Sequence, residues 1–129
     1  MNRLNLGTIR EYCLKKEGEV SEELPFGPDV LVFKVSGRIF LLARIEQHPL
    51  SINLKCEPEL ALELRERYEA VQPGYHMNKK LWNTVALDGS VPRTEVLRMI
   101  DHSYDQVMKG KKIGLKRKRE KINKTKRRH

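Results

Sequence analysis

Residues 30–45 read Val30-Leu31-Val32-Phe33-Lys34-Val35-Ser36-Gly37-Arg38-Ile39-Phe40-Leu41-Leu42-Ala43-Arg44-Ile45, and this stretch decides the fold class. Its two halves, 30–35 and 39–45, are rich in β-branched and aromatic residues, which favour strands. Ser36-Gly37 separates the halves and is typical of a tight hairpin turn. The stretch therefore predicts two neighbouring antiparallel strands.

Further strands are predicted on both sides of this hairpin. Residues 50–55 alternate apolar and polar side chains, which predicts a strand with one wet face. Residues 82–87 predict a short strand that ends at Asp88-Gly89. Residues 20–26 predict an additional edge strand, because the prolines in and after this segment disfavour a central position. Together these segments indicate a small antiparallel sheet.

Three amphipathic segments predict helices. The first follows Asn5, a candidate N-cap, with Thr8 and Glu11 as an alternative capping pair. The second begins at Pro58, and the third begins near Pro92 and is expected to stop at Gly110. Their predicted buried stripes are Leu6, Ile9 and Cys13; Leu60, Ala61, Leu64 and Tyr68; and Val96, Ile100, Tyr104 and Val107. Helices and sheet together predict an α+β domain over residues 1–110.

Residues 111–129, the basic segment, carry the positive charge of the chain. Eleven of these residues are Lys or Arg and one is acidic, so the segment carries +10. The whole chain carries +9, which leaves residues 1–110 close to neutral, at −1. The segment has too few apolar residues to bury a face, and we expect it to be disordered in isolation.

Charge of this density predicts binding to polyanions, of which nucleic acid is the commonest in cells. DNA is the expected partner and RNA the alternative. Because phosphate contacts carry no base information, the segment alone predicts no sequence specificity. The candidate contact residues are Lys116, Arg117, Lys118, Arg119, Lys126, Arg127 and Arg128.

Other classes of protein are disfavoured by what the sequence lacks. No nucleophile-elbow pattern surrounds Ser90, and no glycine pattern for nucleotide phosphates is present, so we expect no enzymatic activity and no cofactor. The two cysteines and four histidines show no metal-ligand spacing, so no metal site is predicted and Cys13 and Cys56 are expected to be reduced and half-buried. No membrane span or secretory signal is apparent, which predicts a cytoplasmic protein.

Residues 72–89 carry a longer and more specific pattern. They read Gln72-Pro73-Gly74-Tyr75-His76-Met77-Asn78-Lys79-Lys80-Leu81-Trp82-Asn83-Thr84-Val85-Ala86-Leu87-Asp88-Gly89. This string closely resembles the signature of the MmcQ/YjbR family of bacterial proteins. The resemblance extends from about Asn5 to Lys109 and includes residues 50–60 and the Asp101-His102-Ser103-Tyr104 stretch.

The resemblance implies a fold similar to CyaY, the frataxin-like fold, with helices on one face of an antiparallel sheet and two projecting hairpins, a double wing. Members of the family are commonly labelled DNA-binding proteins. The basic segment lies outside the shared domain, so its role does not follow from the resemblance. In the wings, Arg38 beside the Ser36-Gly37 turn is the candidate for entering a DNA groove, against the alternative of an ordinary wet sheet face.

Tyr75–Trp82, the signature loop, is the strongest candidate site within the domain. Aromatic side chains can stack on bases, Asn can read an adenine edge and Lys binds phosphate. The candidates for these roles are Tyr75, His76, Asn78, Lys79 and Lys80. Alternatively, His76 and Asn78 brace a turn, and Trp82 is expected to lie in the core.

The sequence therefore predicts a non-enzymatic DNA-binding protein that binds through its basic segment, and through the wings and signature loop. The alternative, from a different functional class, is a protein-interaction or small-ligand module that uses the signature loop. The oligomeric state does not follow from the sequence.

Overall fold

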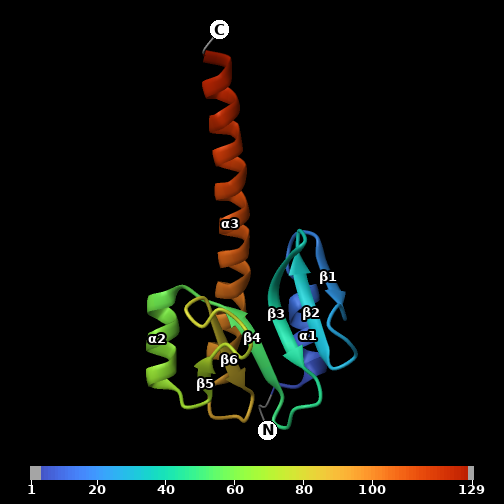
Figure 1. Ribbon diagram of the computed structural model, residues 1–129. Coiled ribbons are helices and arrows are strands. Elements are labelled where there is room, and N and C mark those ends of the chain that lie inside the picture. The colour runs from blue at the N-terminus through green and yellow to red at the C-terminus, as the bar shows by residue number, and fades with distance from the viewer. Residues whose placement is uncertain (1–3, 128–129) are drawn as a thin grey trace.

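A computed structural model describes the backbone of residues 4–127 and the side chains of residues 4–110. A six-stranded sheet has the order β1-β2-β3-β4-β6-β5, and all of its neighbouring strands are antiparallel (Figure 1). The elements in chain order are α1 (Leu6–Leu14), β1 (Val20–Glu23), β2 (Val30–Val35), β3 (Arg38–Arg44), β4 (Ser51–Lys55), α2 (Pro58–Arg67), β5 (Val71–Pro73), β6 (Trp82–Ala86) and α3 (Arg93–Arg127). The predicted α+β class and antiparallel sheet are confirmed.

The predicted hairpin joins β2 and β3. Ser36 and Gly37 both have positive φ, 50° and 79°, which is the backbone of a type I′ turn and matches the twist of the flanking strands. The pairing shifts by one residue between Phe33 and Lys34, so Phe40 is the extra residue of a bulge. The bulge leaves the carbonyl of Phe40 outside the regular ladder, where another partner must satisfy it.

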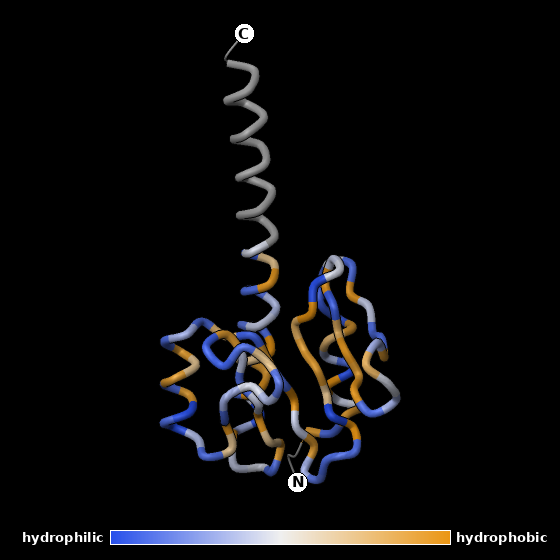
Figure 2. Tube along the Cα trace, in the orientation of Figure 1, coloured by the Kyte–Doolittle hydropathy of each residue, from blue (hydrophilic) through white to orange (hydrophobic). Residues whose placement is uncertain are grey.

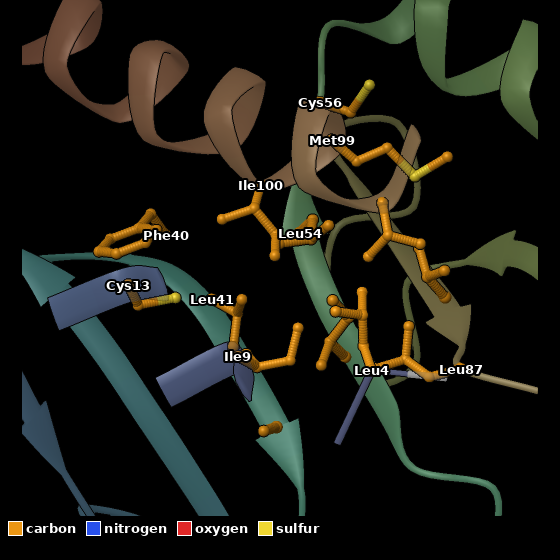
Figure 3. Packing of buried hydrophobic residues seen from close by; sticks show 14 of the residues in the cluster. Leu4, Ile9, Cys13, Phe40, Leu41, Leu54, Cys56, Leu87, Met99 and Ile100 are labelled. Atoms are coloured by element: carbon orange, nitrogen blue, oxygen red, sulfur yellow. The ribbon is translucent and has the colours of Figure 1, made fainter. Parts of the chain in front are cut away.

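All three helices pack on one face of the sheet, as the family resemblance implied. Leu41 and Leu54 point from β3 and β4 toward Ile9 of α1 and Ile100 of α3 (Figure 3). Val85 of β6 belongs to the same cluster, and all five side chains are buried. The hydrophobic segments follow the strands, whereas the connecting loops are mostly hydrophilic (Figure 2). The opposite face of the sheet, which no helix of the described chain covers, is called the open face below.

Ser103 of α3 connects the helix to the sheet. This fully buried hydroxyl donates to the Phe40 carbonyl at 2.5 Å and accepts from the Lys55 amide at 2.8 Å. It therefore satisfies two backbone groups at the bulge and at the end of β4 that would otherwise be buried without partners. The stretch around Ser103, which carried part of the family resemblance, has a structural role here.

Two details of the strands differ from the sequence expectation. β5 was not predicted, because three residues that end in proline give too short a pattern to indicate a strand. The wet face expected for residues 50–55 is wrong: Ser51 and Asn53 are buried as well as Ile52 and Leu54. Loops and neighbouring strands cover this part of the open face, which the alternation of one strand does not reveal.

Trp82 is not a core residue. It is half-buried on the open face, because it alternates with Asn83 and Val85, which point toward the helices. The expectation that Trp82 fills the core is therefore wrong. A large aromatic residue in a strand indicates burial, but which face it occupies depends on pairing with β4 and β5.

The third helix is longer than expected. The sequence predicts its end at Gly110, whereas the α3 backbone continues to Arg127. Lys and Arg are good helix formers, and one glycine inside a helix costs only about 1 kcal/mol, so Gly110 does not force an end. The mobility of the basic segment in solution stays a prediction, and Arg128 lies outside the described residues.

Candidate functional site at the signature loop

The signature loop leaves β5 through Gly74 and returns as β6. The Gly74 amide donates to the Trp82 carbonyl at 2.9 Å, which closes the loop. A Cβ on Gly74 would lie 2.7 Å from the Trp82 Cβ, so only glycine fits at this crossing without a shift of the chain. The glycine of the signature is thus required by a close approach of the two chain segments.

Arg65 of α2 braces the loop from the helix side. Its Nε donates to Asn83 Oδ1 at 2.7 Å, and its Nη2 donates to the backbone carbonyls of Lys79 and Trp82. Asn78 accepts a hydrogen bond from the Lys80 amide at 3.0 Å through its own Oδ1. Asn78 therefore helps to hold the turn through its oxygen, which is the structural alternative stated for it above, and its contact with a base stays a prediction.

Tyr75 and His76 are exposed on the loop. Their ring centroids lie 4.0 Å apart, and the guanidinium of Arg44 in β3 lies 4.3 Å from the Tyr75 ring centroid. His76 has a positive φ of 56°, an uncommon conformation for a residue other than glycine. The loop therefore presents its two rings beside the open face of the sheet.

A cavity of about 390 Å³ lies between the signature loop and the open face. Its apolar wall comes from strands β2 and β3 and from Phe26, and Tyr75, His76 and Met77 form its loop side. Its polar lining includes Arg44 and Asn53. The cavity places three residues of the signature next to two strand residues that the sequence analysis did not select.

The predicted cationic residues lie at one end of the sheet. Arg38 begins β3, and a Cβ on Gly110 would lie 3.3 Å from Arg38 Nη1, so its guanidinium is close to α3. It therefore lies beside α3 as well as beside the Ser36-Gly37 turn, and its contact with a DNA groove stays a prediction. Lys79 and Lys80 are exposed just before β6, whose first residue, Trp82, pairs with Lys55 at the same end of the sheet. Of the basic segment, the structure describes only the helical backbone of residues 111–127.

A second, smaller cavity of about 200 Å³ lies between α2, α3 and the sheet. Cys56, Arg98 and His102 contribute to its lining. His102 Nε2 accepts a hydrogen bond from the Glu57 amide at 3.2 Å, at the start of α2. This hydrogen bond gives His102 a structural role.

The side chains whose pKa values are most strongly shifted have structural roles. Burial raises the pKa of Cys13 to about 12 and that of Cys56 to about 11, and both thiols are free and buried. Burial, followed by a hydrogen bond to Asp101, raises the pKa of Tyr12 to about 12. Lys16 donates to the same carboxylate at 2.5 Å, so this cluster joins α1 to α3.

Among the residues that the structure describes, neither a metal-binding cluster nor a membrane-spanning helix is found. Among them, no three His, Cys, Asp or Glu side chains come together as a group that could hold a metal ion. No helix within residues 4–127 is both long and apolar enough to cross a membrane.

Three residues of the site escaped the sequence analysis: Arg44, Asn53 and Arg65. Asn53 gave a signal, because it is a polar residue between two strongly apolar ones, but the alternation was assigned to a wet face. Arg44 gave no signal, since a charged residue near the end of a predicted strand is typical of a solvated position. Arg65 gave none, since an arginine on a helix rich in glutamate is typical of a solvated face.

Comparisons with known proteins place the chain in a family. The family model for YjbR matches residues 15–106. The uncharacterised protein YjbR of Escherichia coli K12 is 30% identical over 105 residues, which cover 81% of this chain and 88% of that protein. The uncharacterised protein YbdF of Escherichia coli O157:H7 is 37% identical over 86 residues, or 67% of this chain and 70% of YbdF.

Solved structures give the same result. The crystal structure of protein DR2400 of Deinococcus radiodurans, a DUF419 domain, has a TM-score of 0.80 and 37% identity, and the match covers 84% of this chain and 82% of that one. A Pseudomonas syringae protein has a TM-score of 0.69 and 29% identity, with 81% and 99% covered. These names assign no activity. The sequence match and the shared fold show that this chain belongs to the YjbR family.

Proposed function

We propose that this protein binds nucleic acid without catalysing a reaction, and that the basic segment makes the main contact. The observation that carries the proposal is the continuity of α3 from the core into this segment. Val107 is 3% exposed in the core, and the same helix runs on to Arg127 (Figure 1). At 1.5 Å per residue, residues 111–127 add about 25 Å of helix with a high density of cations.

DNA suits such a helix better than double-stranded RNA does. The major groove of B-DNA admits an α-helix, whereas the major groove of A-form RNA is deep and narrow. The contacts would be made to phosphates, so we expect binding without strong sequence preference.

The domain supplies secondary contacts at most. With a charge of about −1 it does not attract DNA as a whole, so binding must use a local positive surface. Arg38 is the best placed, because its guanidinium lies beside Gly110, where the basic segment begins. Lys79 and Lys80 lie at the same end of the sheet, where Arg65 of α2 donates to the Lys79 carbonyl, and should contribute less because α2 carries three acids against two bases.

The test is the salt dependence of binding to a short duplex, measured by fluorescence anisotropy with the full chain. If about 5–8 cations contact phosphates, the slope of log affinity against log salt should be about −4 to −7, with a Kd in the micromolar range at low salt. Replacing Lys116, Arg117, Lys118 and Arg119 together by Gln should make the slope shallower by about 3 to 4.

A control neutralises Lys15, at the end of α1, and Arg93, at the start of α3, two domain cations that line one surface depression outside the basic segment. This variant should keep the slope of the full chain. A slope that is unchanged by the quadruple substitution and by ending the chain at Gly110 would refute the proposal. Duplex RNA of the same length, if it bound equally well or better, would move the assignment from DNA to RNA.

A further inference from the structure

The cavity on the open face has the size and lining of a small-molecule site. Its volume of about 390 Å³ falls within the range of ligand pockets, which are mostly apolar with a few convergent polar groups. Val30, Ile39 and Leu42 supply an apolar floor from β2 and β3. Phe26 and Tyr75, 64% and 49% exposed, stand at its rim as two aromatic side chains with much of their surface in water.

Arg44 gives this cavity a positive charge. Among residues 4–110, no carboxylate forms an ion pair with Arg44, whose guanidinium stacks on Tyr75. The Gln47 amide lies beside it, 3.1 Å from Nη1 when the amide oxygen faces the guanidinium. The acids Asp29 and Glu46, at the same end of the strands, interact with each other, and the hydrogen bond that protonated Glu46 donates to Asp29 raises the pKa of Glu46. Arg44 therefore remains available to an anion from outside the chain.

Asn53 adds a second donor. This side chain is 4% exposed, and its Oδ1 is occupied by the Thr84 hydroxyl at 2.6 Å, which in turn accepts from the Tyr75 amide at 3.0 Å. Its Nδ2 donates only to the Met77 sulfur, at 3.6 Å. A thioether is a weak acceptor on a flexible side chain, so an oxygen acceptor would replace it with a gain in hydrogen bonding.

Arg44 and Asn53 can act on one ligand. Leu42 pairs with Asn53 and Arg44 pairs with Ser51, so Arg44 and Asn53 are diagonal neighbours on the same face of β3 and β4. Side chains in this relation are within reach of one another. Both present N–H donors toward the cavity, and the Asn53 oxygen is already used. The ligand group that matches two donors, one of them charged, is a carboxylate.

We infer that this cavity binds a planar aromatic carboxylate. The carboxylate would accept from Arg44 and from Asn53 Nδ2 in place of Met77, and the ring would lie on the apolar floor against Tyr75. Tyr75 and Asn53 are linked through Thr84, so the signature holds the aromatic wall and the buried donor in one hydrogen-bonded unit. The site is on the face of the sheet opposite α3, so it does not depend on nucleic-acid binding by the basic segment.

The test is a titration of the full-length, ¹⁵N-labelled protein with 2-naphthoate, followed by NMR. Binding should shift the backbone amides of Tyr75, His76 and Met77 and the side-chain amide of Asn53. The neutral analogue 2-naphthamide should bind at least about tenfold more weakly, because it lacks the charge that Arg44 recognises.

Variants distinguish binding in this cavity from a general electrostatic attraction of the anionic ligand to cationic residues. Arg44→Gln should weaken 2-naphthoate about tenfold and leave 2-naphthamide unchanged. The control Lys34→Gln removes a cation from the same face, one that already pairs with Glu23 at 2.7 Å, and should leave both affinities unchanged. Should Arg44→Gln fail to fold, Tyr75→Ala serves in its place, since Tyr75 is exposed; it should also weaken 2-naphthoate about tenfold.

Several outcomes overturn the inference. These are equal affinities for 2-naphthoate and 2-naphthamide, an Arg44→Gln or Tyr75→Ala variant that binds like the wild type, and no binding at millimolar ligand. Shifts confined to the cavity between α2 and α3, or to the basic segment, would also overturn it, since they would place the ligand elsewhere.

Discussion

Replacing Arg65 by methionine tests whether α2 holds the signature loop in place. Arg65 donates to Asn83 Oδ1 at 2.7 Å and to the carbonyls of Lys79 and Trp82. Methionine keeps much of the aliphatic length of the side chain and removes every one of these donors. The substitution therefore separates hydrogen bonding from packing at this position.

The loss of stability depends on whether each acceptor can form a hydrogen bond with water once the Arg65 donors are removed. Asn83 is 2% exposed, so its oxygen cannot turn to water, and a buried acceptor left without a partner costs about 1–3 kcal/mol. The two carbonyls lie nearer to solvent and can bond to water, which adds about 1 kcal/mol in total. We expect the free energy of unfolding to fall by about 2–4 kcal/mol, a large part of the ~5–15 kcal/mol of a typical domain.

Urea unfolding, followed by circular dichroism, measures this difference, and Arg67→Met is the matched control. Arg67 is exposed on the same helix, two residues further on, and its replacement should cost less than about 0.5 kcal/mol. Hydrogen exchange should also show faster exchange of the Gly74 and Leu81 amides, which bond within the loop. Equal stability losses for Arg65→Met and Arg67→Met, or unchanged exchange at these amides, would show that α2 does not brace the loop.

Three other changes test the structure. Ser103→Ala leaves the Phe40 carbonyl and the Lys55 amide without their partner and should lower the free energy of unfolding by about 2–4 kcal/mol. The control Ser90→Ala, at an exposed turn, should lower it by less than about 0.5 kcal/mol. Similar losses for the two variants in urea unfolding would contradict the bridging role of Ser103. Trp82→Ala should lower the free energy of unfolding by only about 1–2 kcal/mol, because the side chain is half-buried on the open face. A decrease near the ~3–5 kcal/mol typical of a core tryptophan would show that Trp82 lies in the core after all. Cys13 and Cys56 should not react with Ellman's reagent at pH 8 until the protein unfolds. Their pKa values in the folded protein, about 12 and about 11, lie above the ordinary 9.0, so the stability that the buried neutral thiols contribute is complete below pH 9 and is lost as pH rises toward 12. A urea midpoint that increases between pH 8 and pH 10.5 would contradict this linkage.

Local pattern predicted most of the elements. The β2–β3 hairpin was predicted from two β-rich runs around Ser36-Gly37, and the Asn5 cap of α1 is seen as a 2.8 Å hydrogen bond to the Thr8 amide. Pro58 begins α2 as expected. These features depend on residues close in sequence, so their physical causes are visible without the fold. β5 and the continuation of α3 past Gly110 were not predicted, since short strands and good helix formers give weak boundary signals.

The candidate site was predicted only in part. The signature loop was selected by its residue types, and the structure places Tyr75, His76 and Met77 at a cavity. Asn78, selected as a reader of bases, accepts a hydrogen bond that holds the turn, and its contact with a base stays a prediction. Arg44 and Asn53 joined the site through strand pairing between distant segments, which no local pattern shows.

The sequence by itself determined the α+β class, the family, the concentration of positive charge after Gly110 and the identity of the signature loop. All of these are properties of composition or of neighbouring residues. Only the tertiary structure decided which face Trp82 occupies, that Arg38 lies against α3, and that Arg65 reaches the loop. The physical reason is that side chains alternate between the two faces of a strand, so each face is assigned by the order β3-β4-β6-β5, and that order arises from long-range pairing and burial.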